Sequence, residues 1–198
     1  MKFVRFAIKC QCSLVALALM GVLPSRALAQ DGHAHAQASQ QTELTADAQA
    51  NALIQTVREA TERFKDVHAA EAEGYALQFG CVSGSDFGAM GLHYVNGALV
   101  NSGVIDPAHP QIVIYEPTAD GKLRLIGADF LVVASKWNAR HGGQPPQLMG
   151  QLFHLFEAPN RFGLPSFYTL HVWAWKANPN GAFVNWHPNV NCQNFSSN

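Results

Sequence analysis

The spacing of the hydrophobic residues changes at Gly74, and this change limits the class of fold. Before Gly74, apolar residues recur every three or four positions, as on one face of an α-helix. This stripe consists of Leu53, Val57, Ala60, Phe64 and Val67. Thr45 or Asp47 can cap the start of the helix, and Gly74 can end it. After Gly74 come short stretches rich in β-branched and aromatic residues, which predict strands.

The predicted strands are joined mostly by short turns. We expect them over residues 75–82, 92–100, 111–116, 122–134, 166–176 and 183–186, with a loop over 135–146 and either a helix or a strand over 147–157. Residues 117–121 are a strong hairpin signal. A helix followed by hairpin-linked strands is typical of an α+β domain. We therefore expect residues 45–198 to form a single domain, in which an N-terminal amphipathic helix packs on a curved, mostly antiparallel sheet or on a partly closed barrel.

The N-terminal residues have the parts of an export signal. Basic residues precede an apolar run over residues 13–23, and small residues follow it at Ala27 and Ala29. This pattern predicts a signal peptide over residues 1–29 that is removed, leaving a mature chain that begins at Gln30. The apolar run is shorter than the ~20 residues of a membrane-spanning helix, so no membrane insertion is expected after cleavage. The polar residues 30–44 are expected to form a flexible leader.

Export also limits the chemistry of the cysteines. Cys10 and Cys12 would leave with the signal peptide, whereas Cys81 and Cys192 would remain. Two cysteines in an oxidising compartment usually pair, so we expect a Cys81–Cys192 disulfide in a periplasmic or secreted protein. The whole chain has 13 Lys and Arg against 14 Asp and Glu, and loss of the basic signal peptide makes it more acidic. A nucleic-acid partner is not expected, because such partners need clustered basic residues.

His171 lies in the clearest predicted strand, which reads Tyr-Thr-Leu-His-Val-Trp-Ala-Trp over residues 168–175. Because side chains alternate across a strand, His171, Trp173 and Trp175 are expected to share one face. Two tryptophans beside a histidine suit the wall of a ligand pocket. They suit equally a face of the hydrophobic core, where a backbone carbonyl would bond the histidine.

Other side chains are also candidates for ligand binding. His93 follows a glycine-rich loop, and loops on a rigid scaffold often carry function. Asp129 falls by alternation on an otherwise apolar strand face, where an acid is either paired or has a shifted pKa. His154 and Glu157 would share a face if their segment were helical, as the ligands of helical metal sites do. They would point apart if it were a strand.

Two segments resemble a group of secreted bacterial proteins that have no assigned activity. They read Gly-Leu-His-Tyr-Val-Asn at residues 91–96 and Leu-His-Val-Trp-Ala-Trp at 170–175, and Asn-Pro-Asn-Gly-Ala-Phe follows at 178–183 before Cys192. The similarity spans about residues 57–192. It implies no activity, but it implies that a site or core signature includes His93, Tyr94, Asn96, His171, Trp173 and Trp175. The group has Asn where this chain has His187, so no ligand role for His187 is implied.

Three functions are compatible with these residues. In the first, the protein binds zinc, copper or iron, either as a metal-binding protein or as a metal-dependent enzyme acting on a small molecule. Its ligands would come from His93, His171, His154, Asp129 and Glu157. We then expect His93 and His171 on facing or neighbouring strands, with both side chains in one pocket.

In the second, a metal-free module binds a small molecule in an aromatic-lined pocket. That pocket would be formed by Tyr94, Asn96, Trp173, Trp175 and Phe183. In the third, the protein is an accessory envelope protein without a pocket.

Overall fold

The computed structural model describes residues 31–196, and side chains from residue 45 onward. The predicted signal peptide over residues 1–29 lies outside the described residues. The chain divides into two units, residues 1–38 and 39–198. Of the first unit, residues 31–38 are helical backbone. The second unit contains the folded domain.

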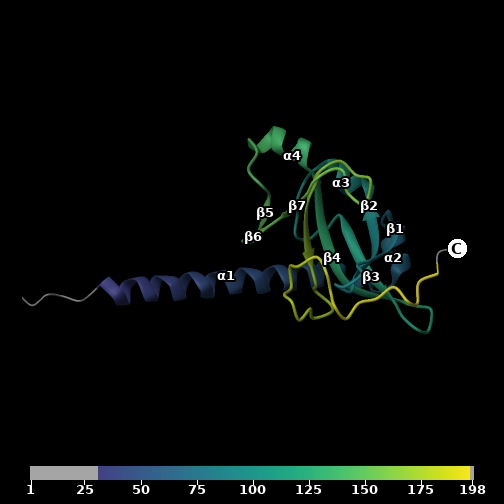
Figure 1. The fold of residues 1–198 in the computed structure, drawn as a ribbon, viewed down its shortest axis with the longest axis horizontal. Helices are drawn as coiled ribbons and strands as arrows, with labels where there is room; N and C mark the ends of the chain where they lie inside the picture. The colour runs from purple at the N-terminus through teal and green to yellow at the C-terminus, as the bar shows by residue number, and fades with distance from the viewer. Residues whose placement is uncertain (1–30, 197–198) are drawn as a thin grey trace, which may run out of the picture. The chain divides into compact units, whose positions relative to one another are not determined.

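The helical part of the chain comes before the sheet in sequence (Figure 1). It consists of α1 (Asp31–Thr61), the 3-10 helix η1 (Glu62–Lys65) and α2 (Val67–Ala72). α1 includes residues 31–44, which the sequence predicts as a leader; alanine and glutamine in this stretch favour helical backbone. The one predicted helix is broken before Val67 because Asp66 caps α2 by accepting a hydrogen bond from the backbone N–H of His68.

The sheet contains six strands in the order β1-β2-β3-β4-β8-β7. The strands are β1 (Tyr75–Ser83), β2 (Ala89–Asn96), β3 (Ile112–Pro117), β4 (Leu123–Val133), β7 (His154–Phe156) and β8 (Phe167–Val172). Every neighbouring pair is antiparallel. The predicted α+β class with a mostly antiparallel sheet is therefore confirmed. Within residues 31–196 the sheet is open, with β1 and β7 at its edges, and no closed barrel forms.

Two segments predicted without helices contain short ones. The strand predicted over residues 92–100 ends at Asn96, whose side chain accepts hydrogen bonds from the N–H groups of Ala98 and Leu99 and so caps α3 (Gly97–Ser102). The loop predicted after β4 begins with α4 (Ala134–His141). Both predictions were wrong because a local side-chain cap or a short helix does not alter the hydrophobic period.

Two segments in the C-terminal part of the chain differ from single strands. One was predicted as either a helix or a strand, and the other as the last strand. Residues 147–157 form β5 (Gln147–Leu148), β6 (Gln151–Leu152) and β7, not a helix. β5 and β6 make a separate two-stranded hairpin. The strand predicted over residues 183–186 is absent from the described part of the chain, and only an isolated bridge joins Ala89 to His187 there.

The sheet is buried on both faces. On one face, Leu53 and Val57 of α1 share a core cluster with Phe130 and Leu170 of the sheet. Phe64 of η1 belongs to a neighbouring cluster on that face. On the other face, a third cluster joins Ile112, Ile114, Ile126, Leu131, Phe167 and Trp173. The candidate site lies on this second face, opposite α1 and η1.

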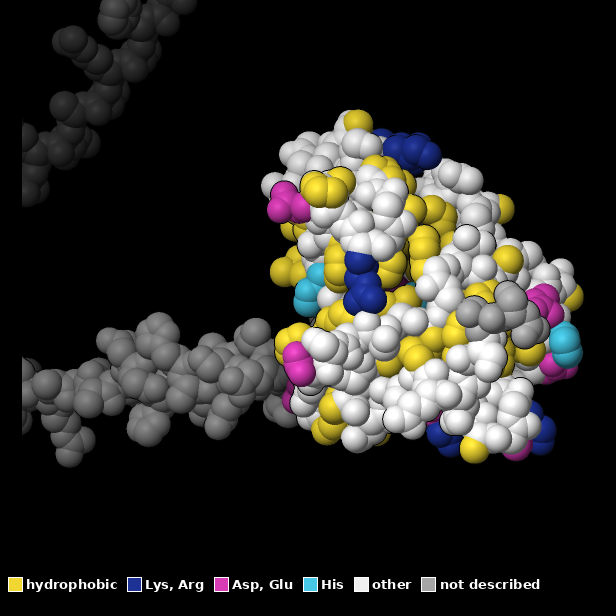
Figure 2. All heavy atoms as spheres, turned by 45° about the vertical axis from the view of Figure 1, so that its right-hand side comes forward, with side chains coloured by type: hydrophobic (Ala, Val, Ile, Leu, Met, Phe, Trp, Pro, Cys, Tyr) yellow, Lys and Arg dark blue, Asp and Glu magenta, His cyan; other side chains and the backbone are white. Residues whose placement is uncertain are grey.

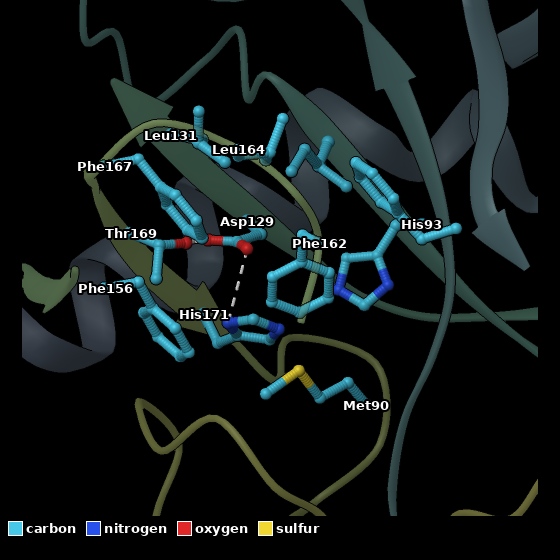
Figure 3. A pocket seen from close by; sticks show the side chains of 12 residues that line it. Met90, His93, Asp129, Leu131, Phe156, Phe162, Leu164, Phe167, Thr169 and His171 are labelled. Atoms are coloured by element: carbon cyan, nitrogen blue, oxygen red, sulfur yellow. Dashed lines mark hydrogen bonds and ion pairs between the residues drawn. The ribbon is translucent and has the colours of Figure 1, made fainter. Parts of the chain in front are cut away.

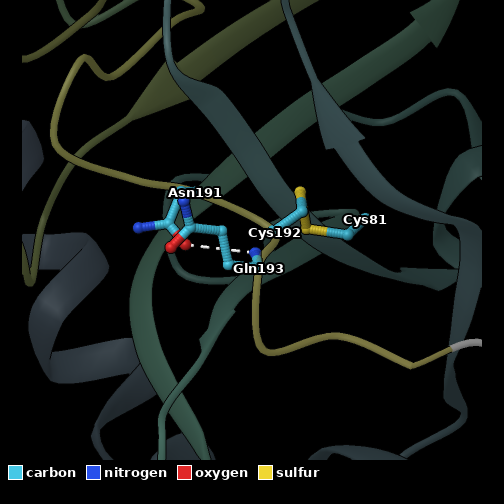
Figure 4. The surroundings of a disulfide bond; sticks show 4 residues. All are labelled: Cys81, Asn191, Cys192 and Gln193. Atoms are coloured by element: carbon cyan, nitrogen blue, oxygen red, sulfur yellow. Dashed lines mark hydrogen bonds between the residues drawn. A yellow bond between two sulfur atoms is a disulfide. The ribbon is translucent and has the colours of Figure 1, made fainter.

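The predicted disulfide joins Cys81 of β1 to Cys192 in the C-terminal segment (Figure 4). The two cysteines are 111 positions apart in the sequence. The disulfide is confirmed, and it indicates an oxidising environment outside the cytoplasm. None of the helices within residues 31–196 is both long and apolar enough to cross a membrane.

Candidate metal centre

Three metal-ligand side chains from three different strands converge on the face of the sheet opposite α1. They are His93 of β2, Asp129 of β4 and His171 of β8 (Figure 3). One ligand atom from each lies within 4.8 Å of the other two. All three residues are buried, with 5%, 3% and 2% of their surface exposed. Among the described residues this is the one group of three or more such side chains that could hold a metal ion.

The convergence of the two histidines requires a curved sheet. His93 and His171 belong to strands that are separated by β3 and β4. Three strand spacings across a flat sheet amount to roughly 14 Å. Their ring centroids are only 5.6 Å apart, so the sheet bends and both side chains reach toward the same point. The predicted shared pocket is therefore confirmed. Of the two predicted arrangements, neighbouring strands are excluded by the strand order.

Strand pairing places Asp129 beside His171. Asp129 pairs with His171 across β4 and β8, and with Ile112 across β3 and β4. Residues that are paired in this way have side chains on the same face. Strand alternation adds Thr169 and Leu131 to that face. The carboxylate and the imidazole are thus neighbours as a direct result of the register of β4 and β8.

A glycine in β2 allows this strand to approach its partner. Gly91 lies two residues before His93 and has φ +95°, a conformation that residues with a side chain rarely adopt. A Cβ atom at this position would lie 2.5 Å from the carbonyl oxygen of Tyr115 on β3. The glycine therefore permits the close contact between β2 and β3 from which His93 projects.

Asp129 is held by its neighbour Thr169. The Thr169 hydroxyl donates a hydrogen bond of 2.5 Å to Oδ1 of Asp129. Oδ2 lies 3.3 Å from Nδ1 of His171, without the geometry of a hydrogen bond. Burial raises the pKa of the Asp129 carboxyl to about 6, and the Thr169 hydrogen bond opposes this rise. The group is thus a carboxylate at neutral pH that exchanges its proton in mildly acidic solution.

The two imidazoles are neutral at physiological pH. Burial, and secondarily the nearby His171, lowers the pKa of His93 to about 4. Burial, and secondarily His154, lowers the pKa of His171 to about 3. Neutral imidazole is the form that binds metals. Because His171 is uncharged, its contact with Asp129 is not a salt bridge at neutral pH.

Several ring nitrogens in this group have no hydrogen-bond partner within the described residues. They are Nδ1 of His93 and both Nδ1 and Nε2 of His171. A buried polar atom without a partner costs about 1–3 kcal/mol, so three of them together are a considerable cost. Buried polar atoms of this kind call for a partner, such as a bound ion or an ordered water molecule.

The ligand atoms line a small chamber with otherwise apolar walls. Its volume is about 30 Å³, which is room for a water molecule or an ion but not for an organic compound. Besides the three ligand residues and Thr169, the chamber is lined by Met90 and by a group of phenylalanines: Phe79, Phe156, Phe162 and Phe167. The rings of Phe79 and Phe162 meet edge to face with their centroids 5.4 Å apart. A low-polarity wall strengthens any electrostatic interaction within the chamber.

Two predicted metal ligands do not join this group. His154 lies in β7, paired with Thr169, but its side chain is exposed. Glu157 follows the end of β7 and is also exposed. The prediction that they act as ligands depended partly on a helix that is not formed. His154 lies on an edge strand and Glu157 in the loop after it, and both side chains are exposed to solvent instead of entering the chamber.

The predicted aromatic pocket is not formed. Tyr94 packs with Tyr115 in the cluster beside η1 and α2, and Asn96 caps α3. Trp173 contacts His171, but Trp175 packs in the two clusters of the opposite face, as Phe183 does in one of them.

The predicted common face of Trp173 and Trp175 was wrong because β8 ends at Val172. Beyond it the backbone turns, with the Ala174 N–H bonded to the Val172 carbonyl. Strand alternation therefore stops three residues before Trp175.

Sequence reasoning missed several residues that line the chamber. Thr169 could have been identified, because it is two residues from His171 and alternation places both on one face. Phe79 could not, because it enters through an irregularity in β1 between Gln78 and Cys81. His187, by contrast, is fully buried, and both of its ring nitrogens have partners, the Ala177 carbonyl and the Asn189 N–H. Its role is structural.

Comparison with known proteins found no match: no family model fits the chain, and no curated protein or solved structure is similar to it. The function has to be argued from the site itself.

Proposed function

We propose that this is an exported metal-binding protein whose centre consists of His93, Asp129 and His171. The observation that carries the proposal is the convergence of three buried ligand groups from three strands within 4.8 Å of one another. A metal ion would bind one nitrogen of each imidazole, and it would favour the carboxylate form of Asp129. The Thr169 hydroxyl, which is hydrogen-bonded to this carboxylate, would hold it in place, as partners of metal ligands commonly do.

The donor set suits zinc or ferrous iron best. Two histidines and one carboxylate are the ligands of many mononuclear non-haem iron sites, and zinc accepts the same donors. Histidine-rich sets also bind copper. Thiolate ligation is not available from Cys81 and Cys192, because these residues form a disulfide. Three protein ligands leave a coordination position open, which is the arrangement of catalytic rather than purely structural sites.

The compartment proposed for this chemistry is the periplasm or the exterior of the cell. The disulfide supports it, as does the signal peptide predicted over residues 1–29. An exported site would acquire its metal outside the reducing cytoplasm.

A metal-free binding protein is the second candidate. It is favoured by the apolar lining of the chamber, where four phenylalanines surround the polar group. In this case each neutral imidazole would donate one hydrogen bond and accept another, with trapped water or one polar end of the ligand as its partner.

Metal analysis separates these candidates. The protein is purified without a histidine tag and its metal content is measured by mass spectrometry. It is then stripped with chelator and titrated calorimetrically with Zn²⁺, Fe²⁺ under anaerobic conditions, and Cu²⁺. We expect one ion per chain. Single replacements H93Q, D129N and H171Q should each weaken metal binding by more than about a hundredfold. Loss of a residue that only supports a metal ligand already weakens binding by about 10–100-fold, and loss of a ligand should weaken it more.

His109→Gln is the matched control. His109 is an exposed histidine between α3 and β3, so H109Q should bind the metal as tightly as the parent protein does. The proposal is overturned if the stripped protein binds none of the three metals, or if H109Q loses as much affinity as H171Q.

A further inference from the structure

A second and larger cavity lies beside the histidine chamber. Its volume is about 260 Å³, compared with about 30 Å³ for the chamber. The two cavities share five wall residues: Phe79, Ile112, Leu131, Leu164 and Phe167. The remaining wall of the larger cavity is formed mainly by valines, and Gln78 is its one polar side chain. It contains no charged side chain.

Phe79 stands between the two cavities in an unusual conformation. Its φ of +65° lies in the left-handed region, which a phenylalanine rarely occupies. Such strained residues cluster where proteins bind ligands. Its side chain is 47% exposed although it is large and apolar. Figure 2 shows patches of hydrophobic side chains on one face of the molecule. An exposed phenylalanine beside an apolar cavity is suited to covering a ligand.

We propose that the larger cavity binds the apolar body of a small molecule and that one oxygen-bearing end of this molecule reaches the chamber of His93 and His171. The inference deepens the proposed function, because it names the class of compound that would meet the metal ion. The unpartnered nitrogens of the two buried histidines can bind a polar group of a ligand that enters the chamber. The neighbouring apolar walls supply the affinity, because binding removes apolar surface of the ligand and of the cavity from water.

The same walls disfavour polar compounds. A sugar or an amino acid would bury several hydroxyl, amino or carboxyl groups against valine, leucine and phenylalanine side chains. Each such group without a partner weakens binding by about fivefold or more. The volume also limits the compound, since drug-sized ligands occupy sites of about 300–1,000 Å³. The expected ligand is therefore smaller and carries a single polar end.

The test compares two probes of nearly equal length. The first is n-hexanol, and the second is the hexane diol that carries a hydroxyl at each end. Binding to the purified protein is measured by calorimetry and by ligand-observed NMR, with and without Zn²⁺. We expect n-hexanol to bind in both states. The diol should bind at least about fivefold more weakly, because its second hydroxyl would be buried without a partner.

Two matched variants locate the binding site. Val95 lines the larger cavity but not the chamber, so V95F should weaken n-hexanol binding by about tenfold or more as the ring fills the space. Val104 is 60% exposed and lines neither cavity, so V104F should change binding by less than about twofold. If circular dichroism shows that V95F does not fold, Val100→Phe on α3 fills the same cavity.

The outcomes separate this inference from the metal proposal. If Zn²⁺ binds but n-hexanol does not, or if n-hexanol binding is unaffected in the folded variant, the apolar-ligand inference is overturned and the metal centre stands. If n-hexanol binds and V95F abolishes it while no metal binds, the ligand cavity stands and the metal centre does not. Equal binding of the diol and n-hexanol also overturns the inference.

Discussion

The stability of the metal-free protein should fall steeply between pH 7.5 and pH 5. Burial lowers the pKa of His93 to about 4 and that of His171 to about 3. In the unfolded chain both histidines titrate near pH 6.5. Below pH 6.5 the unfolded chain therefore binds two protons that the folded protein does not bind. Protons then favour the unfolded state, and stability present above pH 6.5 is lost as the pH falls.

The size of the loss follows from these pKa values. Each histidine contributes about 1.4 kcal/mol per pH unit, or about 2 kcal/mol between pH 6.5 and pH 5. Asp129 acts in the opposite direction, because burial raises the pKa of its carboxyl to about 6. The folded protein takes up a proton at Asp129 before the unfolded chain does, which returns about 1.4 kcal/mol between pH 6 and pH 5. The net loss is about 3 kcal/mol.

The assay is urea unfolding in the presence of chelator at pH 7.5, 6.5, 5.5 and 5.0, followed by circular dichroism. His171→Gln removes one titrating imidazole, so its pH-dependent loss should be smaller than that of the wild type by about 2 kcal/mol. His109→Gln, at an exposed histidine, should retain the wild-type pH dependence. The comparison uses the difference between two pH values within each variant, so a constant change in stability cancels.

Two results would refute the reasoning. One is a free energy of unfolding that stays constant between pH 7.5 and pH 5 in the metal-free wild type. The other is an unchanged pH dependence in H171Q. Either would mean that the histidines are not buried as neutral groups in the folded state.

Three further outcomes are expected. Intact-mass analysis of protein from the cell envelope should give a mature chain that begins at Gln30, and a mass that retains the signal peptide contradicts this. Reduction of Cys81–Cys192 should lower the free energy of unfolding by about 4–5 kcal/mol, since the bond closes a loop of 111 residues; an unchanged urea midpoint, or free thiols in the denatured mature protein, would argue against the bond. Gly91→Ala should cost at least about 2 kcal/mol, because its Cβ would clash with a backbone carbonyl. Gly142→Ala, with left-handed φ but nothing within 4 Å, should cost only about 1 kcal/mol, and equal costs would contradict the clash.

The sequence predicts the site better than the pocket around it, and the reason is periodicity. Asp129 and His171 were recognised because strand alternation holds through β4 and β8, where their side chains lie. The pairing of these strands then brings them together. Alternation fails where the backbone leaves the strand, so Trp175 was assigned to the wrong face. It fails also at the irregularity of β1, so Phe79 was not identified at all.

The degree of curvature is the second property that the sequence does not specify: a curved sheet is expected, but how far it bends is not. The convergence of His93 with His171 depends on how far the sheet bends over β3 and β4. The bend arises from long-range packing and from the fit of individual residues such as Gly91, not from a local pattern. His154 shows the opposite error: it lies on the strand next to β8 and pairs with Thr169, yet remains exposed. Its residue type and its place in the sheet suit a metal ligand, but its side chain is not buried.

The strand order has a consequence for when the site can exist during synthesis. β8, which carries His171, lies between β4 and β7 in the sheet, although it comes after both in the chain. Hence a chain that emerges N-terminus first has His93 and Asp129 long before it has the third ligand. A partly synthesised chain that ends before β8 offers only two of the three donors. High metal affinity would thus arise only at a late stage of folding. Metal uptake by a newly made chain would therefore indicate that β8, the last strand in the sequence, has been inserted between β4 and β7.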